Sequence, residues 1–383
     1  MEEWRNATTA RDDAGAADAG RSQLPELEAV LYIGTSGGLE ANIVPRAGVA
    51  LRHVEAAALR GLSPWRMLVN GLATLRGVAQ AWRILREFRP DVVLATGGYA
   101  SVPVAVAAWL RRCPVLVYLP DIQPGLAIRF LARLTRRVAV SFDAALAYFA
   151  PGKAVVTGYP VRPALFSGAE DRHSAREQLG LAGGVKTLLI LGGSRGAHSI
   201  NVAINEDLEK LLQLAQIVHS AGEEDIAWLQ ERKDKLPAEL RRRYHLYSYL
   251  HEEMVPALLA ADLAVARAGA ATMGEFAAAG LPSLLVPYPY SGQHQDANAD
   301  FLVSRGAALK VLDGKLAPRI RGTEDQKGAL LQTVDRLLAD EGALRSMGDN
   351  ARKLARPDAA RVIVRQLVLL AAGTPSRCCG GGV

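Results

Sequence analysis

The sequence predicts an α/β fold with parallel sheets in two domains, and three observations support that prediction. The chain has 383 residues, which is long enough for two domains of ordinary size. Short apolar runs recur along it, and several end in a glycine-rich turn that leads into a helix-like segment, as in βαβ units. Two of these turns begin at Gly192 and Arg267, and open α/β sheets bind ligands at the carboxyl ends of their strands.

The composition is that of a globular protein, with 50% hydrophobic and 22% charged residues. Three cysteines do not form a disulfide framework, because Cys113 lies in an apolar segment and Cys378 and Cys379 lie in a glycine-rich tail. A reducing cytoplasm fits this pattern best. Residues 1–27 show no sustained periodicity and no signal-peptide pattern, so we expect a disordered or misassigned N-terminus there.

Positive charge is concentrated in two stretches of the first half, although the net charge of the whole chain is only +6. One stretch runs from Arg60 to Pro90 with a single acid, Glu87, and the other runs from Leu126 to Phe142. Such a basic surface can meet nucleic acid or anionic lipid. Because no aromatic-interleaved or zinc-finger pattern accompanies it, the sequence favours an anionic membrane surface over nucleic acid.

The first domain is expected over residues 28–163, beginning with a strand at 27–33 and a helix-like segment at 39–44. A long helix follows at 64–88, and a strand at 91–95 leads through Gly97-Gly98 into a helix that ends near Leu110. The uncharged run 92–110 approaches the length of a membrane span, but its glycines and Pro103 divide it, so we expect buried core. Further strands are expected at 114–119 and near Val138 and Ala154.

The helix at 64–88 carries one apolar stripe, formed by Leu68, Leu72, Leu75 and Val78. A stripe of this kind usually faces a protein core. Flanking arginines allow a second interpretation, in which the stripe contacts lipid and the arginines meet head groups.

The second domain is expected over residues 164–370, after a linker with one short helix, and is followed by a tail at 371–383. Strands are expected at 187–191, at 215–219, before Tyr249–His251, at 263–266 and at 283–286. Helices are expected from Ser199 and from Ala270 to a stop at Gly280, and beyond Ala307 we expect only helix.

A phosphate and ribose site is predicted at the helix that begins near Ala270. Its free N–H groups and the positive end of its dipole favour phosphate oxygens, and Thr272 adds a hydroxyl. Glu275 lies one turn on, about 5 Å away by its spacing, where a carboxylate can accept hydrogen bonds from ribose hydroxyls. The alternative is a packing helix whose glycines only permit close approach to the sheet.

A polar loop after the last strand carries His294, Gln295 and Asn298. Amides and imidazole both donate and accept hydrogen bonds, which suits a neutral polyol. A solvated loop without a ligand is the alternative.

Six motifs in order, from about residue 28 to residue 370, resemble the MurG family of bacterial N-acetylglucosaminyltransferases (glycosyltransferase family 28). They are Gly34–Ala41, Gly97–Tyr99, Gly158–Arg162, Gly192–Ala197, Arg267–Glu275 and Gln293–Asn298. The resemblance implies two Rossmann-like domains facing a cleft (GT-B architecture). It also implies inverting transfer of N-acetylglucosamine from UDP-N-acetylglucosamine to undecaprenyl-diphospho-muramoyl-pentapeptide (lipid I to lipid II), without metal or cofactor, at the cytoplasmic face of the cell membrane as a peripheral protein.

The resemblance also implies roles for individual residues, and it leaves the catalytic base unassigned. The substrate-binding residues for UDP-N-acetylglucosamine would be Asp121, Arg162, Ser194, Leu250, His251, Ala270, Ala271, Thr272, Met273, Gly274, Glu275, His294 and Gln295. Ser194 and Arg162 would lie near the diphosphate, Leu250 or His251 near uracil, and His294 and Gln295 at the sugar. The stripe Leu68, Leu72, Leu75 and Val78 falls where the family carries its membrane patch.

Two departures from the family pattern stand out. The family opens with a strand and a Gly-Gly-Thr-Gly-Gly-His loop, which has no counterpart here. Asp121 stands where the family has an amide, and it is either a general base or a helix-capping aspartate. Two other functions therefore stay open, a UDP-N-acetylglucosamine 2-epimerase-like enzyme and a truncated chain that binds the donor without catalysis.

Overall fold

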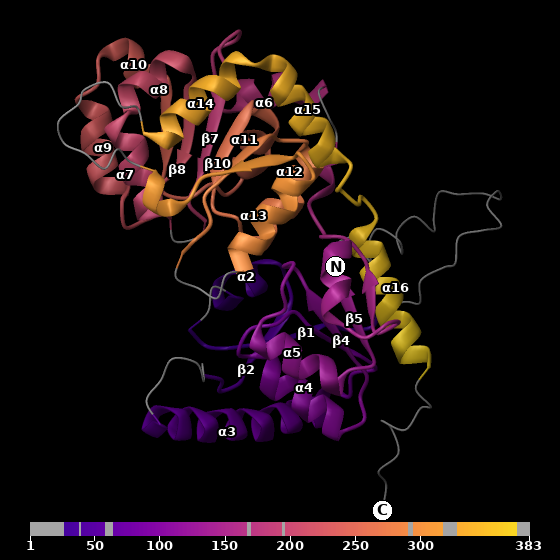
Figure 1. Cartoon of the computed structure of the whole chain (residues 1–383). Helices are drawn as coiled ribbons and strands as arrows, with labels where there is room; N and C mark the ends of the chain where they lie inside the picture. The colour runs from indigo at the N-terminus through magenta and orange to yellow at the C-terminus, as the bar shows by residue number, and fades with distance from the viewer. Residues whose placement is uncertain are drawn as a thin grey trace, which may run out of the picture. The chain divides into compact units, whose positions relative to one another are not determined.

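The structure, a computed structural model, describes residues 27–37, 40–57, 64–166, 170–193, 196–289, 294–316 and 328–373. The chain forms two compact α/β units, so the predicted fold class is confirmed (Figure 1). The first unit comprises residues up to Pro120, Pro124–Thr157 and the segment from Asp358, and the second comprises Asp121–Gln123 and Gly158–Pro357. The main boundary thus lies slightly before the expected residue 163. The last helix belongs to the first unit, not to the second domain as expected.

The first unit contains parallel strands in two separate sheets, one of order β1-β2 and one of order β3-β4-β5-β6. The strands are β1 Leu31–Gly34, β2 Ala50–His53, β3 Val93–Ala95, β4 Val115–Leu119, β5 Arg137–Val140 and β6 Ala154–Val156. The helices are α2 Glu40–Arg46, α3 Pro64–Phe88, α4 Ser101–Leu110, α5 Leu126–Leu134 and α16 Ala359–Ala372. Strand β2 was not expected from the sequence. It lacks an apolar run, and three of its four residues are exposed.

The core of the first unit lies between its strands and helices α3, α4 and α5. Ala81 and Leu85 of α3 pack with Val117 and Val138 of the sheet. Helix α16 covers the other face of β4 and β5, where Ile363 and Leu370 join Tyr118 (Figure 1). Burial on both faces explains why β4 is apolar throughout.

The second unit contains one continuous six-stranded parallel sheet of order β12-β11-β10-β7-β8-β9. Its strands are β7 Thr187–Leu191, β8 Gln216–Ser220, β9 Tyr244–Tyr247, β10 Leu263–Ala266, β11 Ser283–Leu285 and β12 Ala308–Lys310. Its helices are α6 Glu170–Gln178, α7 His198–Glu206, α8 Leu208–Leu214, α9 Ile226–Asp234, α10 Ala238–Arg242, α11 Met254–Ala260, α12 Ala270–Ala279, α13 His294–Ser304, α14 Ala329–Ala339 and α15 Glu341–Arg352. The sequence predicted only helix beyond Ala307, but the structure has strand β12 directly after that residue.

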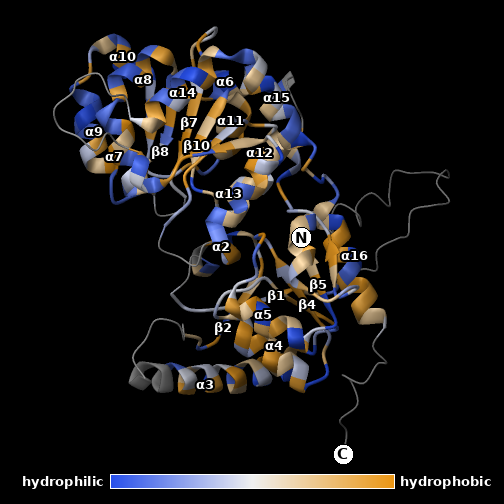
Figure 2. Cartoon of the chain, viewed as in Figure 1, coloured by the Kyte–Doolittle hydropathy of each residue, from blue (hydrophilic) through white to orange (hydrophobic). Residues whose placement is uncertain are grey.

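Helices cover the sheet of the second unit, and their outward surfaces are largely hydrophilic (Figure 2). From β7 the chain proceeds to β8 and β9 on one side, and from β10 it proceeds to β11 and β12 on the other. The strand order therefore reverses between β7 and β10, and an open α/β sheet binds ligands at the carboxyl ends of strands at such a point. Within the described ranges, no helix has both the length and the apolar character needed to cross a membrane.

Candidate functional site

The glycine turn after β7 delivers the start of helix α7 to the reversal point of the second sheet. Gly193 and Gly196 adopt left-handed backbone angles, with φ of 88° and 79°. A Cβ on Gly196 would also lie 2.2 Å from the carbonyl oxygen of Ala221, so only glycine fits there. Ser194, expected near the diphosphate, lies outside the described residues.

Helix α12 begins at the same reversal point, directly after β10. Gly269 is its N-cap, and the N–H of Met273 donates to the Gly269 carbonyl, the first bond of the helix. The N–H groups of Ala270, Ala271 and Thr272 precede that bond, so they remain available for an anion. Met273 was expected in the site, but its N–H is used inside the helix and its side chain is fully buried. It therefore belongs to the core.

Glu275 and Arg162 form an ion pair beside the first turn of α12. Arg162 Nη2 lies 3.3 Å from Glu275 Oε1, and about half of the arginine side chain is exposed. Burial raises the pKa of the Glu275 carboxyl above its usual value, although Arg162 acts in the opposite direction. The two residues expected at ribose and diphosphate thus lie together in the second unit.

Tyr159 packs against the same turn of α12. An ideal Cβ on Gly274 would lie 2.2 Å from Cδ1 of the Tyr159 ring, so the glycine makes room for the tyrosine. Burial raises the pKa of the Tyr159 phenol to about 12, and the nearby carboxylates of Glu275 and Asp121 add to the shift. The phenol consequently stays protonated and can only donate or accept a hydrogen bond at neutral pH.

His294 and Gln295 were expected in a loop, but they form the first turn of helix α13. The Nδ1 atom of His294 is buried and has no hydrogen-bond partner among the described residues. Buried polar atoms are rarely left unpaired in proteins, so this atom is able to bond a group from outside the chain. One polar atom of the Gln295 side chain is already used, since its Oε1 accepts from the N–H of Tyr288 at 2.9 Å.

Asn298 holds Asp121 and is structural, not a ligand for a polyol. Its fully buried amide donates to Asp121 Oδ1 at 2.8 Å and to the Ala268 carbonyl, and it accepts from the N–H of Ile122 at 3.0 Å. Asp121 caps no helix, because α5 begins after Gly125. The capping interpretation of Asp121 is therefore wrong.

Leu250 and His251 follow β9. Leu250 is buried, whereas His251 is exposed and stacks edge-to-face on Tyr249 at 4.7 Å. The N–H of His251 donates to Glu253 at 3.1 Å. Because the His251 N–H is already bonded to Glu253, a nucleobase at this segment would bond other main-chain N–H or carbonyl groups.

Two polar networks beneath the site were not found from the sequence. Buried Arg267 bonds Asp313 and Ser199 at 2.5 and 2.8 Å, which ties the end of β10 to the start of α7. Next to it, Asp225 binds Nδ1 of His198 at 2.8 Å and the amide of Asn201 at 2.7 Å. Each network joins residues far apart in the chain, and no spacing rule could have signalled them.

Exposed apolar side chains of the first unit lie on α3 and α4. Leu72 and Leu75 are 51% and 67% exposed, whereas Val78 packs against the core and the side chain of Leu68 is not among those described. The expected stripe is thus divided between solvent and core. The sequence missed Trp82 and Trp109, which are also exposed, and Arg111 lies 5.1 Å from the centre of the Trp82 ring.

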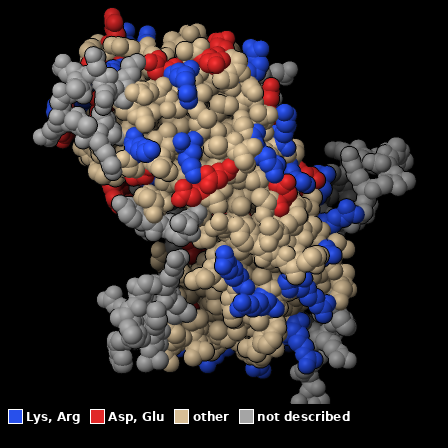
Figure 3. Space-filling model, viewed as in Figure 1, with Lys and Arg blue, Asp and Glu red and all other residues tan. Residues whose placement is uncertain are grey.

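Exposed basic side chains are numerous on the helices of the first unit. Figure 3 shows Lys and Arg gathered over the first unit on the face in view. Exposed arginines on α3, on α5 and just after α4 and α5 are Arg76, Arg83, Arg86, Arg112, Arg129, Arg133 and Arg136. Within the described ranges, no group of three or more His, Cys, Asp or Glu residues could hold a metal ion.

Comparisons with known proteins point to one family. A model of the glycosyltransferase family 28 C-terminal domain matches residues 187–363, and a model of the N-terminal domain matches residues 19–140. A Roseiflexus protein named UDP-N-acetylglucosamine N-acetylmuramyl-(pentapeptide) pyrophosphoryl-undecaprenol N-acetylglucosamine transferase is 42% identical, over 93% of this chain and 88% of its own length. A Moorella thermoacetica protein of the same name is 38% identical, over 88% and 90%.

Solved structures agree with this match. The crystal structure of Acinetobacter baumannii MurG is 26% identical with a TM-score of 0.64, covering 88% of this chain and 90% of that one. The Neisseria meningitidis UDP-GlcNAc 2-epimerase bound to UDP-GlcNAc has a TM-score of 0.59 over 88% and 99% of the two chains. At 16% identity, the epimerase shares the fold alone.

Proposed function

The chain belongs to glycosyltransferase family 28, and we infer that it transfers N-acetylglucosamine from UDP-N-acetylglucosamine to undecaprenyl-diphospho-muramoyl-pentapeptide in peptidoglycan synthesis. The observation that carries this inference is the 42% identity to a transferase of that name along 93% of the chain. Both family domains are matched in order, which further supports a transferase with a donor and an acceptor side.

The donor occupies the second unit in this proposal. The N–H groups of Ala270, Ala271 and Thr272 would bind a phosphate, and Glu275 would accept hydrogen bonds from the ribose hydroxyls. Arg162 has five N–H donors, of which its contact with Glu275 uses only part, so it can also reach the diphosphate. The buried, unpartnered Nδ1 of His294 supports a sugar contact at α13.

The reaction would be a direct displacement with inversion. The muramoyl hydroxyl oxygen bonds to the anomeric carbon as the bond from that carbon to the diphosphate breaks, and the hydroxyl proton passes to a base. Negative charge develops on the departing UDP. The first turn of α12 and Arg162 would stabilise that charge, and such stabilisation is often the largest single contribution to catalysis.

We further propose that α3 and α4 rest on the cytoplasmic face of an anionic membrane. Leu72, Leu75 and the two exposed tryptophans would enter the interface, and the exposed arginines of the first unit would meet acidic head groups. Each basic side chain near such a surface contributes about 1 kcal/mol. Contact of this kind would bring a lipid-linked acceptor to the enzyme.

The function is tested with labelled UDP-N-acetylglucosamine and an acceptor that carries a short, water-soluble lipid. Release of UDP together with a labelled, larger acceptor is expected. Conversion of the donor to its C2 epimer without acceptor would instead indicate an epimerase. Saturable UDP binding with neither reaction would leave a donor-binding protein without catalysis.

A further inference from the structure

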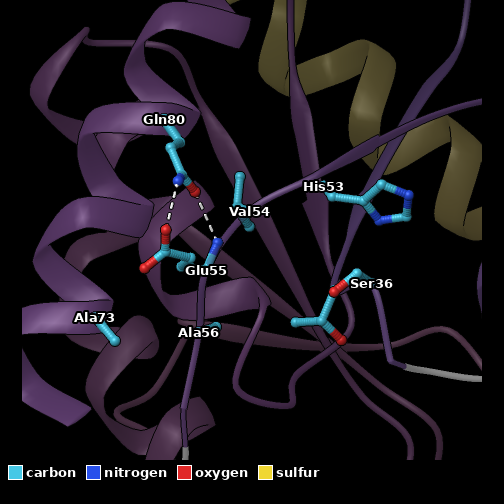
Figure 4. Close-up of a pocket in the computed structure, with 8 residues that line it drawn as sticks. Ser36, His53, Val54, Glu55, Ala56, Ala73 and Gln80 are labelled. Carbon is cyan, nitrogen blue, oxygen red and sulfur yellow. Dashed lines mark hydrogen bonds between the residues drawn. The ribbon is translucent and has the colours of Figure 1, made fainter. Parts of the chain in front are cut away.

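An open cavity of about 350 Å³, with a mixed polar and apolar lining, lies in the first unit at the carboxyl ends of β1 and β2 (Figure 4). Of its lining residues, Thr35 and Ser36 belong to the motif Gly34–Ala41, and the others belong to no motif singled out from the sequence. Thr35 and Ser36 follow β1, His53 and Glu55 close β2, and Ala73 and Gln80 come from α3. Ligands of open α/β sheets bind at this edge, so the cavity lies where the fold favours a site.

One wall of the cavity is held rigid by paired hydrogen bonds. Gln80 Nε2 donates to Glu55 Oε1 at 3.0 Å, and the Glu55 N–H donates back to Gln80 Oε1 at 2.7 Å. Helix α3 approaches the main chain closely here, because a Cβ on Gly77 would lie 1.9 Å from the Glu55 carbonyl oxygen. The second oxygen of Glu55 is not used by Gln80, so it can accept a hydrogen bond from a ligand.

The opposite side of the cavity carries a hydroxyl and an imidazole. Figure 4 shows Ser36 and His53 across from Glu55 and Gln80, with the His53 ring turned away from those two residues. The turn that bears Ser36 is fixed by Glu40, whose Oε1 accepts from the N–H and the hydroxyl of Thr35 at 3.2 and 3.1 Å. Hydrogen bonds from its own main-chain N–H and from Thr35 lower the pKa of Glu40, which therefore keeps its negative charge.

The chemistry of the lining selects a class of ligand. Among the described residues, no lysine or arginine lines the cavity, and two carboxylates lie in or beside it, so a phosphate is disfavoured. Hydroxyl, amide and carboxylate groups match hydroxyls and amide N–H groups of a neutral ligand. Val54, Ala56 and Ala73 add an apolar side that suits a methyl group. A volume of 350 Å³ is near the lower end of ligand sites, so it fits one substituted sugar.

We propose that this cavity binds the N-acylated amino-sugar portion of the acceptor. This assignment rests on the proposed transferase function, which supplies an acceptor of that chemistry. Glu55 accepts from a sugar hydroxyl or amide N–H, Ser36 and Gln80 bond the remaining polar groups, and Ala73 contacts the acyl methyl.

Two substitutions test the site by different means. Glu55→Gln keeps the side-chain shape but removes the charge and one acceptor, and Ala73→Phe fills the space without removing a polar group. Glu55→Gln should raise the KM for acceptor at least about tenfold, since a lost hydrogen bond to a charged group has about that effect. Ala73→Phe should also raise the KM, because its ring occupies the space proposed for the acyl methyl. The Kd for UDP should not change. Ala47→Phe makes the same change at an exposed position of the first unit that lies outside both the cavity lining and helix α3, so it is the control and should keep the wild-type KM.

The outcomes separate this proposal from the proposed function. If transfer proceeds and neither variant changes the acceptor KM, the cavity assignment is overturned and the transferase stands. If the wild type transfers no sugar, calorimetry with a soluble N-acetylmuramoyl dipeptide decides. Saturable binding that Glu55→Gln weakens supports the cavity, and absence of binding to the wild type overturns it. Should Ala73→Phe fail to fold, judged by circular dichroism and UDP binding, Ser36→Ala takes its place.

Discussion

Arg162 and Glu275 lie 3.3 Å apart although 113 positions separate them in the chain. The pair brings the turn after β6 to the first turns of α12, so a cation and a carboxylate meet at the reversal point of the second sheet. An ion pair this exposed contributes little to stability, about 0–1 kcal/mol. We therefore expect the Arg162–Glu275 ion pair to contribute to ligand binding more than to folding stability.

Replacing Glu275 should weaken nucleotide binding. Glu275→Ala removes the carboxylate that we propose accepts from ribose hydroxyls, and hydrogen bonds to charged groups contribute about 1.5–3 kcal/mol. The Kd for UDP should rise at least about tenfold in calorimetry. Asp335→Ala on α14 serves as the control at another acid of the second unit. Wild-type affinity in Glu275→Ala would remove the ribose assignment.

Gly274→Ala should destabilise the second unit. Its new methyl would lie 2.2 Å from the Tyr159 ring, and overpacking of this kind costs about 1–3 kcal/mol. Gly71→Ala in α3 is the counterpart, because a Cβ there meets nothing within 4 Å. That change should stabilise the first unit by about 1 kcal/mol through helix propensity. Urea denaturation measures both, and equal effects would contradict the packing argument.

The free energy of unfolding of the second unit should fall on acidification. Burial lowers the pKa of His219 to about 3, against about 6.5 in an unfolded chain. Between these values the unfolded chain binds the extra proton, so the contribution is complete above about pH 6.5 and is lost toward about pH 3. Fluorescence of Trp228, the single tryptophan of residues 158–357, reports the transition.

His219→Gln should flatten that pH dependence, even though it also lowers stability by disturbing the bonds to Tyr244 and Asn201. His173→Gln provides the comparison, since the His173 side chain is 85% exposed. It should leave the pH slope unchanged. A slope that survives in His219→Gln would assign the acid sensitivity to other groups.

Removing Leu72 and Leu75 should weaken membrane association. The double change to alanine removes apolar surface worth about 0.8 kcal/mol per buried methylene, so binding to anionic vesicles should fall more than about tenfold. UDP affinity should stay the same. Leu369→Ala on α16 tests whether any exposed leucine has this effect. Equal vesicle binding by all three proteins would refute the docking proposal.

Chelation should leave sugar transfer intact. The resemblance implies a reaction without metal, in which main-chain N–H groups and Arg162 stabilise the departing diphosphate. Excess EDTA in the transfer assay is therefore expected to leave the rate unchanged. A rate that collapses with EDTA and returns with Mg²⁺ would show that a cation contributes to leaving-group stabilisation.

Local sequence patterns predicted local structure well. Helix α3 has the predicted bounds because Pro64 suits a first helical turn and the apolar spacing continues to Phe88. Helix α12 likewise begins at Ala270 and ends before Gly280, whose φ of 62° terminates it. Strand β2 was not predicted, because an exposed edge strand does not require the apolar run that identifies a buried strand.

Contacts between distant segments could not be predicted. Asn298 and Asp121 are 177 positions apart, and only the folded chain shows that the amide serves the carboxylate instead of a sugar. The placement of α16 in the first unit depends on the fit of Ile363 and Leu370 to one face of a sheet. The cavity beside Glu55 and Gln80 likewise arises from side chains that no motif groups together.

The short sheet of β1 and β2 has a consequence for motion. Among the described residues, β1 pairs only with β2, whereas β7 and β10 each have a strand on both sides. A two-stranded sheet is marginal without further packing, so its amide hydrogens should exchange with deuterium well before those of β7. A sugar bound between Glu55 and Ser36 would slow that exchange, which couples ligand capture to the ordering of this end of the first unit.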